Sequence, residues 1–247
     1  MATYSDEGVV LRTHKLGEAD RIVTILTRQH GKIRAVAKGV RRTSSRFGAR
    51  LEPFSQCDLL IVEGRNLDIV SQAVSRRLLG RAWLDDYARY TAAEVMVETA
   101  DRLVGEERQP ALRQYLLLVG ALRVLGHGTT DGPRPATMIL DSYLLRALAT
   151  AGYAPALEAC ANCGASAGLD FFSAQSGGLV CRRCRPPGSL SLTPTTLAYL
   201  GALLSGQWED TRQVSEATAR QASGLVTAFA NWQLERGLRS LGHLDRG

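Results

Sequence analysis

The chain has 247 residues, of which 45% are hydrophobic, and its mean hydropathy is -0.08. This length and composition are typical of a folded protein with one to three domains and exclude a disordered tail. No apolar run reaches the roughly 18 to 20 residues of a membrane span, because Arg123 interrupts the best one, Tyr115 to Leu125. The first seven residues lack the pattern of a secretory signal, so we expect a cytoplasmic protein without membrane contact.

The formal net charge of +6 lies entirely in the first third of the chain. Residues 1–80 carry 14 Lys and Arg against 8 Asp and Glu, whereas the remainder is balanced at 16 against 16. Within the first third, residues 32–50 hold seven basic side chains and no acidic one. A charged run is often only a solvated face, but such faces normally mix both signs. We therefore expect this segment to bind an anion.

The first 79 residues are predicted to form a small closed sheet. Five short runs are rich in β-branched and apolar residues and are separated by Gly, Asp and Asn. Five strands within this length predict a barrel of the oligonucleotide-binding (OB) type, which binds single strands through a charged groove and aromatic platforms. The predicted strands are Glu7–His14, Arg21–Arg28, Lys32–Lys38, Asp58–Glu63 and Leu67–Val74.

The third predicted strand carries basic residues at alternate positions. Period-two alternation is typical of a half-buried strand, so Lys32, Arg34 and Lys38 are expected to line one solvent-exposed face. The Arg41–Arg50 segment, with its Thr, Ser and Gly residues, is predicted to be a flexible basic loop. The role of Phe47 in this loop is left open by the sequence. Its ring could be exposed and stack on a base, or it could pack against the domain.

Residues 80–247 are predicted to form a helical domain. Leu, Val, Ala and Tyr recur here at helical spacing, and a loop rich in Gly separates two of the segments at residues 126–133. We expect a small insertion at about residues 157–190 to interrupt this domain. The predicted helices are Ala82–Val104, Ala111–Leu125, Ala136–Ala151, Pro194–Leu204 and Arg212–Leu241.

Two Cys-x-x-Cys pairs mark the insertion, Cys160 with Cys163 and Cys181 with Cys184. This spacing is typical of a metal site in which four thiolates surround one ion, and Zn²⁺ accepts four sulfurs tetrahedrally. Disulfides are the alternative, but they need an oxidising compartment that nothing in the sequence indicates. Four thiolates leave no open position on the metal, which predicts a single structural Zn²⁺.

Residues 17–24 (GEADRIVT) and 31–42 (GKIRAVAKGVRR) resemble the N-terminal signature of the bacterial DNA repair protein RecO family. Gly152–Pro155 before the first cysteine pair, and Phe172–Ser173 with Gly177–Gly178 before the second, are similar to its middle region. The similarity spans nearly the whole chain in the same order. It implies an α+β multidomain protein, with an N-terminal five-stranded OB-fold β-barrel and an all-α domain that carries an inserted four-cysteine zinc finger.

The resemblance also implies a function and partners. Members of this family are recombination mediators of RecF-type DNA repair that bind single- and double-stranded DNA and anneal complementary strands. They act with RecR and with the C-terminal tail of the single-stranded-DNA-binding protein, and so help to load RecA. A nucleoid-associated location would follow. Some members have lost the four cysteines, but this chain keeps all of them.

The basic segment supplies the candidate phosphate contacts. Lys and Arg fix the position of a phosphate without reading sequence, so DNA binding should be indifferent to sequence. If four to six of these side chains touch phosphate, the slope of log affinity against log salt should be about -3 to -5. The candidate DNA-binding residues are Lys32, Arg34, Lys38, Arg41, Arg42, Arg46, Phe47 and Arg50.

An enzymatic function is not expected. The acidic pairs Asp85–Asp86, Glu106–Glu107 and Glu209–Asp210 are adjacent in sequence, where helical neighbours point apart, so solvated charge is the preferred interpretation over a Mg²⁺ site. No Gly-rich loop with Gly-Lys-Ser/Thr occurs, which argues against ATP use. The alternative function is a zinc-containing interaction scaffold of the replication and repair machinery, without annealing activity of its own.

Overall fold

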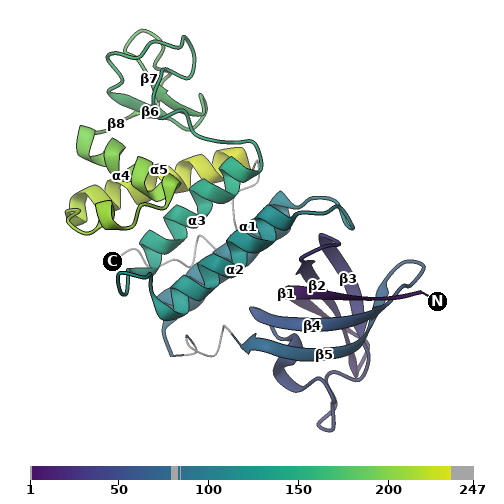
Figure 1. The fold of residues 1–247 in the computed structure, drawn as a ribbon. Helices are drawn as coiled ribbons and strands as arrows, with labels where there is room; N and C mark the ends of the chain where they lie inside the picture. The colour runs from purple at the N-terminus through teal and green to yellow at the C-terminus, as the bar shows by residue number, and fades with distance from the viewer. Residues whose placement is uncertain (1, 79–82, 84, 235–247) are drawn as a thin grey trace. The chain divides into compact units, whose positions relative to one another are not determined.

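The computed structural model of the protein describes residues 2–78, 83 and 85–234. The chain divides into two compact units, Met1–Gly126 and His127–Gly247. The first unit contains the strands β1 to β5 with the helices α1 and α2, and the second contains the remaining helices and a small sheet (Figure 1). Each unit is described by itself below.

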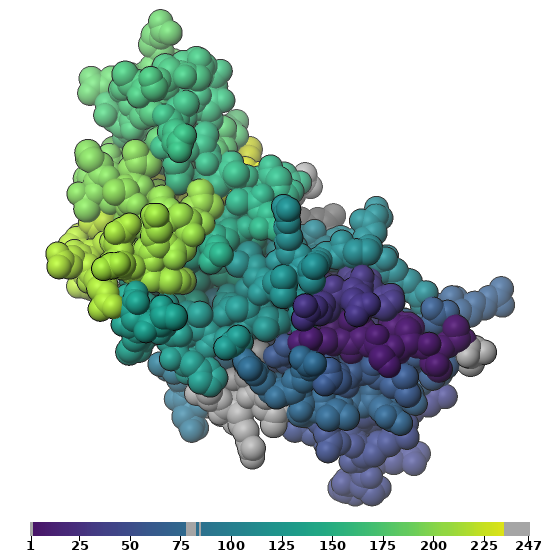
Figure 2. All heavy atoms as spheres, in the orientation of Figure 1, coloured from purple at the N-terminus to yellow at the C-terminus, as the bar shows by residue number. Residues whose placement is uncertain are grey.

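The first unit is built on a closed five-stranded barrel, as the sequence predicts. The strand order around the barrel is β1-β2-β3-β5-β4, in which only the β3–β5 pair is parallel. This is the Greek-key connectivity of an OB-fold. In the space-filling view, the side chains of β1 and β4 lie side by side on the visible face (Figure 2). The strands are β1 (Thr3–Leu16), β2 (Asp20–Thr27), β3 (Lys32–Ala37), β4 (Ser55–Val62) and β5 (Asp68–Leu78).

The barrel interior is filled by the apolar side chains that alternate along the strands. Ile25, Ile33 and Ile61 are each at most 1% exposed and belong to one contiguous core. A short 3-10 turn, η1 (Gly48–Leu51), adds Leu51 to this core between β3 and β4. Buried positions alternate with more exposed ones over Ile33–Ala37 of β3 and Asp58–Val62 of β4, because period two matches the pleat, whereas Val23–Thr27 of β2 are buried without a break.

Two helices follow the barrel in the first unit, α1 (Tyr87–Leu103) and α2 (Leu112–His127). The side chain of Asp86 accepts a hydrogen bond from the Arg89 backbone N–H at 3.0 Å and caps the start of α1. Of the predicted helical residues 82–86, the structure describes 83, 85 and 86, and these precede the α-helix, with Trp83 in a 3-10 turn. Both helices belong to the same compact unit as the barrel. The boundary between the compact units therefore differs from the boundary between the predicted domains, residues 1–79 and 80–247. That domain division remains a prediction.

A partly buried polar network joins α2 to the barrel. The Tyr115 hydroxyl donates to Glu7 Oε1 at 2.7 Å, and Gln56 Nε2 donates to the same oxygen at 2.5 Å. The guanidinium groups of Arg76 and Arg28 lie 3.3 and 3.5 Å from Glu7 Oε2. Burial favours the neutral acid, but these donors outweigh it and hold the pKa of Glu7 below its usual value. The carboxylate is therefore fixed in its charged form.

The second unit is a three-helix cluster, with α3 (Ala136–Thr150), α4 (Pro194–Ser205) and α5 (Glu216–Gln233) packed against one another. Thr193 caps α4 by accepting from the Thr196 N–H at 3.1 Å, and Gly206 ends it in the left-handed conformation. Ser215 caps α5, so this helix begins four residues later than predicted. The predicted C-terminal part of this helix, residues 235–241, lies outside the described residues.

The insertion between α3 and α4 contains three short strands, β6 (Phe171–Ser173), β7 (Gly178–Val180) and β8 (Leu190–Ser191), in the order β7-β6-β8. The Phe172 ring meets the Phe229 ring of α5 edge to face, at 6.0 Å between centroids. This contact fixes the insertion to the helices of its own unit. Over the part of the chain that the structure describes, no helix is both long and apolar enough to cross a bilayer.

The Glu7 network generates a stability prediction. Because the folded-state pKa of Glu7 lies below its unfolded value of about 4.5, its stabilisation is present above that value and is lost as the pH falls through the folded-state pKa. Glu7→Gln should lower the free energy of unfolding at pH 7 by about 1 to 3 kcal/mol, and by less at pH 3. Chemical unfolding at both pH values measures the difference.

The matched control is Glu18→Gln, which removes an exposed carboxylate from the β1–β2 turn and should change stability little at either pH. An equal loss for Glu7→Gln at pH 7 and pH 3 would contradict the account.

Candidate nucleic-acid interface and metal centre

The segment from the end of β3 through η1 presents five exposed basic side chains, here called the basic loop: Lys38, Arg41, Arg42, Arg46 and Arg50. Where these side chains have partners, the partners are neutral. Arg41 Nη1 donates to the Glu18 carbonyl at 2.8 Å, and Arg50 Nη1 donates to the Arg46 carbonyl at 2.5 Å. Among the described residues, none of the five forms an ion pair. Their positive charge is therefore uncompensated.

The backbone of the basic loop is held by its own hydrogen bonds and by the β1–β2 turn. Gly39 N–H donates to Asp20 Oδ1 at 2.7 Å, and Arg41 N–H donates to the Ala19 carbonyl at 3.0 Å. Arg42 N–H donates to the Gly39 carbonyl at 3.1 Å, which closes a turn. These bonds place the guanidinium groups on one end of the barrel, where they are accessible to an extended anion.

Two of the predicted DNA-binding residues form ion pairs with carboxylates of the protein itself. Lys32 is only 9% exposed, and its Nζ donates to the Asp101 carbonyl at 2.7 Å and to Asp101 Oδ1 at 3.1 Å. Arg34 is more exposed, but its Nε pairs with the Glu107 carboxylate. The prediction that Lys32, Arg34 and Lys38 share one solvent-exposed face is therefore wrong for Lys32. The cause is that the end of α1 lies over the start of β3.

Phe47 does not offer a stacking platform. Its ring is 1% exposed and packs in the barrel core, so the interpretation as an exposed aromatic is wrong. The Arg46 guanidinium lies over the ring, 5.0 Å from its centroid. Phe47 instead anchors the basic loop by burying an apolar side chain beneath it, which is the second of the two interpretations that the sequence left open.

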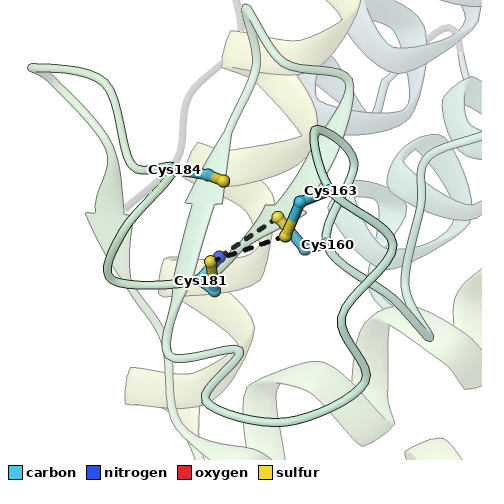
Figure 3. A group of neighbouring side chains, drawn as sticks. All are labelled: Cys160, Cys163, Cys181 and Cys184. Carbon is cyan, nitrogen blue, oxygen red and sulfur yellow. Dashed lines mark hydrogen bonds between the residues drawn. The ribbon is translucent and has the colours of Figure 1, made fainter.

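The four cysteines of the insertion converge as their spacing predicts. Cys160 and Cys163 precede β6, and Cys181 and Cys184 follow β7, so the small sheet brings the two pairs together. The four sulfur atoms lie within 4.8 Å of one another, and their side chains point toward a common centre (Figure 3). All four are free cysteines, which excludes the disulfide alternative in this structure.

The sulfur separations suit a tetrahedral metal site. Four bonds of about 2.3 Å at tetrahedral angles place zinc-bound sulfurs about 3.8 Å apart. The Cys163 and Cys181 sulfurs are separated by 3.9 Å. Within each pair the chain turns tightly, because the Gly164 N–H donates to the Cys160 carbonyl at 2.8 Å and the Cys184 N–H donates to the Cys181 carbonyl at 3.1 Å.

Backbone dipoles prepare the cluster for a cation. The Cys181 N–H points at Cys160 Sγ, 3.4 Å away, and with the N–H groups of Asn162 and Cys163 it lowers the pKa of the Cys160 thiol to about 6. The neighbouring thiols act in the opposite direction on Cys184, since hydrogen bonding first with Cys163 and then with Cys181 raises its pKa to about 12. Four thiolates together need a multivalent cation to offset their mutual repulsion.

The insertion has little apolar core of its own. Its cluster comprises Cys160, Val180 and Cys181, with only a few partly buried neighbours. One of these neighbours, Phe171, is covered by the Arg185 guanidinium at 4.3 Å from the ring centroid. Gly178 pairs closely with Ala156, and a Cβ at Gly178 would lie 2.4 Å from the Ala156 carbonyl oxygen. So small a core is typical of modules that a metal holds together.

The predicted acidic pairs have other partners. Asp86 caps α1, and Glu107 pairs with Arg34. Within the described ranges, the four cysteines are the only group of three or more potential ligand side chains close enough to share a metal. The sequence did not indicate that Asp101 and Glu107 neutralise the basic side chains of β3. Their contacts with Lys32 and Arg34 span about seventy residues of sequence, beyond the reach of a local pattern.

Comparison with known proteins agrees with this architecture. The family model described as "Recombination protein O N terminal" matches residues 1–78, and the model described as "Recombination protein O C terminal" matches residues 84–242. Over 246 residues, the chain is 57% identical to the DNA repair protein RecO of Cutibacterium acnes, with 100% of both chains covered.

Two further relatives carry the same name. The DNA repair protein RecO of a Nocardioides species is 54% identical, with 98% of this chain and 99% of the relative covered. That of Thermobifida fusca is 52% identical, with 100% of both chains covered. Since the two family models together match both the barrel and the helical part, and the relatives match end to end, the chain belongs to the recombination protein O family.

Proposed function

We propose that the protein is a recombination mediator in a RecF-type pathway of DNA repair. Family membership supports the broader role in DNA repair and recombination. The finer proposal is that the protein binds single- and double-stranded DNA, anneals complementary strands and helps RecA to load onto DNA coated with single-stranded-DNA-binding protein. It acts without catalytic residues, because annealing breaks no covalent bond.

The observation that carries this proposal is the uncompensated charge of the basic loop. Bringing two complementary strands together opposes the repulsion of their phosphates, and cations on a protein surface reduce that repulsion. Arg and Lys contacts to phosphate are indifferent to base sequence, which an annealing protein requires. The loop projects from an OB-type barrel, a fold that commonly binds extended single strands.

The proposed protein partners are RecR, the C-terminal tail of the single-stranded-DNA-binding protein and, indirectly, RecA. The family resemblance implies that this tail is acidic and apolar, and such a tail requires an apolar surface with arginine beside it. Helix α2 offers such a surface, since Leu112 and Leu116 are 46% and 48% exposed on one helical face and Arg113 is also exposed. We propose this face for the tail and assign no surface to RecR. The proposed location is cytoplasmic and nucleoid-associated.

The proposed cofactor is one structural Zn²⁺, held by Cys160, Cys163, Cys181 and Cys184. The donor set and the sulfur separations support zinc, and four protein ligands leave no position for a reacting water. In this role the metal would hold the insertion together and would not contact DNA. The DNA-binding surface and the metal centre would then be separable.

Strand annealing is the direct test of the proposed function. The protein should accelerate the pairing of complementary oligonucleotides, both bare and coated with single-stranded-DNA-binding protein, and should leave labelled DNA uncut in the presence of Mg²⁺. Binding of the coat protein without any acceleration would instead favour the interaction scaffold. Cleavage in Mg²⁺ would overturn the proposal that the protein is not an enzyme.

Salt dependence tests the basic loop. With five phosphate contacts, the slope of log affinity for single-stranded DNA against log salt should be about -3.5. In the variant Arg41→Ala/Arg42→Ala/Arg46→Ala/Arg50→Ala, one contact remains and the slope should fall to about -0.7. Fluorescence anisotropy with a labelled oligonucleotide over a salt series measures both values.

The matched control replaces the same four arginines by lysine, which keeps the charge and should keep the slope of the unmodified protein. An unchanged slope in the alanine variant, with circular dichroism showing an intact barrel, would place the DNA-binding surface elsewhere.

Metal analysis tests the cysteine cluster. The purified protein should contain one zinc per chain, and Cys160→Ala should lose most of it, because three thiolates hold the ion less tightly than four. Single-strand affinity should stay within about twofold of the unmodified protein. Cys57→Ala is the control, since Cys57 lies in the barrel core and donates to the Arg50 carbonyl, so this variant should keep its metal. A metal-free unmodified protein would contradict the proposal.

A further inference from the structure

The segment between α1 and α2 lies along the start of β3 like an additional short strand. Glu107 forms a parallel bridge with Lys32, and the Arg108 N–H donates to the Lys32 carbonyl at 2.8 Å. Gly31 permits this close approach, because a Cβ at this position would lie 1.7 Å from the Gln109 carbonyl oxygen. The backbone of the segment is therefore fixed against the barrel.

A second anchor holds the same segment. Arg108 Nη2 lies 2.5 Å from Asp68 Oδ1, and the Asp68 side chain is only 2% exposed. The Tyr4 hydroxyl donates to the other oxygen of Asp68 at 3.0 Å, which fixes this carboxylate in turn. Arg108 adopts a positive φ of 63°, a conformation that a residue with a side chain keeps only where its surroundings impose it. These contacts hold the preceding residue, Glu107, at a defined place.

The consequence concerns Arg34. Its Nε pairs with the Glu107 carboxylate, and the two side chains are 46% and 37% exposed. Arg34 is exposed on β3, and Lys38, also exposed, directly follows the last residue of this strand, so four residues at extended spacing, about 13 Å, separate them. A strand of DNA bound by the basic loop and extended along β3 would therefore reach Arg34 next. The guanidinium of Arg34 is already paired with the Glu107 carboxylate.

We propose that Glu107 is a built-in competitor of DNA phosphate for Arg34. The ion pair is solvent-exposed, so it is weak enough to exchange. Because the carboxylate is tethered beside Arg34, it outcompetes free anions, and only a polyanion already held by neighbouring cations displaces it. Arg34 thus contributes to binding only after the basic loop is occupied. This inference rests on the proposed DNA binding. It adds that Glu107 limits the affinity for DNA, so that bound strands can still dissociate and exchange.

The competition has a definite signature in salt. While Glu107 occupies Arg34, this arginine neutralises no phosphate and releases no counter-ion from the DNA. In Glu107→Gln the competition disappears, and Arg34 is free to contact phosphate throughout. The slope of log affinity for single-stranded DNA against log salt should then become steeper by about 0.7, the value of one added phosphate contact.

Two further variants make the test specific. Glu106→Gln removes the same charge from the neighbouring residue, which hydrogen-bonds Gln109 and does not touch Arg34, so its slope should match that of the unmodified protein. The double variant Arg34→Ala/Glu107→Gln keeps the net charge of the unmodified protein and should lose the gain seen in Glu107→Gln. Thermal melting checks that all three variants keep the fold.

The outcomes separate this inference from the proposed function. If the unmodified protein binds with a slope near -3.5 but Glu107→Gln has the same slope, the competition is refuted and the proposed function stands. An equal gain in Glu106→Gln would show a general effect of charge and would also refute the competition. If the unmodified protein does not bind DNA, both proposals fail.

Discussion

Some basic side chains on and after β3 are paired with carboxylates and others are not, and this difference determines what the barrel can bind. Half of the 14 basic residues in the first third of the chain lie along one strand and the loop after it, yet these two parts have opposite surroundings. At the start of β3, Asp101 and Glu107 neutralise Lys32 and Arg34. Beyond β3, the side chains of the basic loop find only carbonyls and a ring as partners. Charge that is paired inside the protein stabilises the fold, and unpaired charge remains available to a polyanion.

This division also explains the grouping of α1 and α2 with the barrel. The ion pairs of Asp101 and Glu107, together with the Tyr115–Glu7 network, connect both helices to the strands through polar side chains. The insertion of the second unit depends on a different interaction, the convergence of four thiols around a small core. The two candidate functional sites therefore depend on separate residues and on separate physical causes.

Local features of the fold could be predicted from the sequence, whereas tertiary contacts could not. The five strands and the cysteine cluster follow from alternation and from ligand spacing, which are properties of short segments. The burial of Phe47 and Lys32 depends on residues far away in sequence, namely the barrel core and Asp101 of α1. A basic run shows how much charge is present, but only the positions of acidic residues in space show how much of it is already neutralised. Glu107 was visible in the sequence as half of an acidic pair, with nothing to indicate its place beside Arg34.

Hydrogen exchange with and without a single-stranded oligonucleotide tests the central claim most directly. The amides of Arg42, Ser45 and Arg50 are hydrogen-bonded within the basic loop, so their exchange rates report on changes there. The account predicts that the oligonucleotide slows exchange across residues 38–50 and leaves the cysteine cluster unchanged. Slower exchange confined to the insertion, with no change in the basic loop, would contradict it.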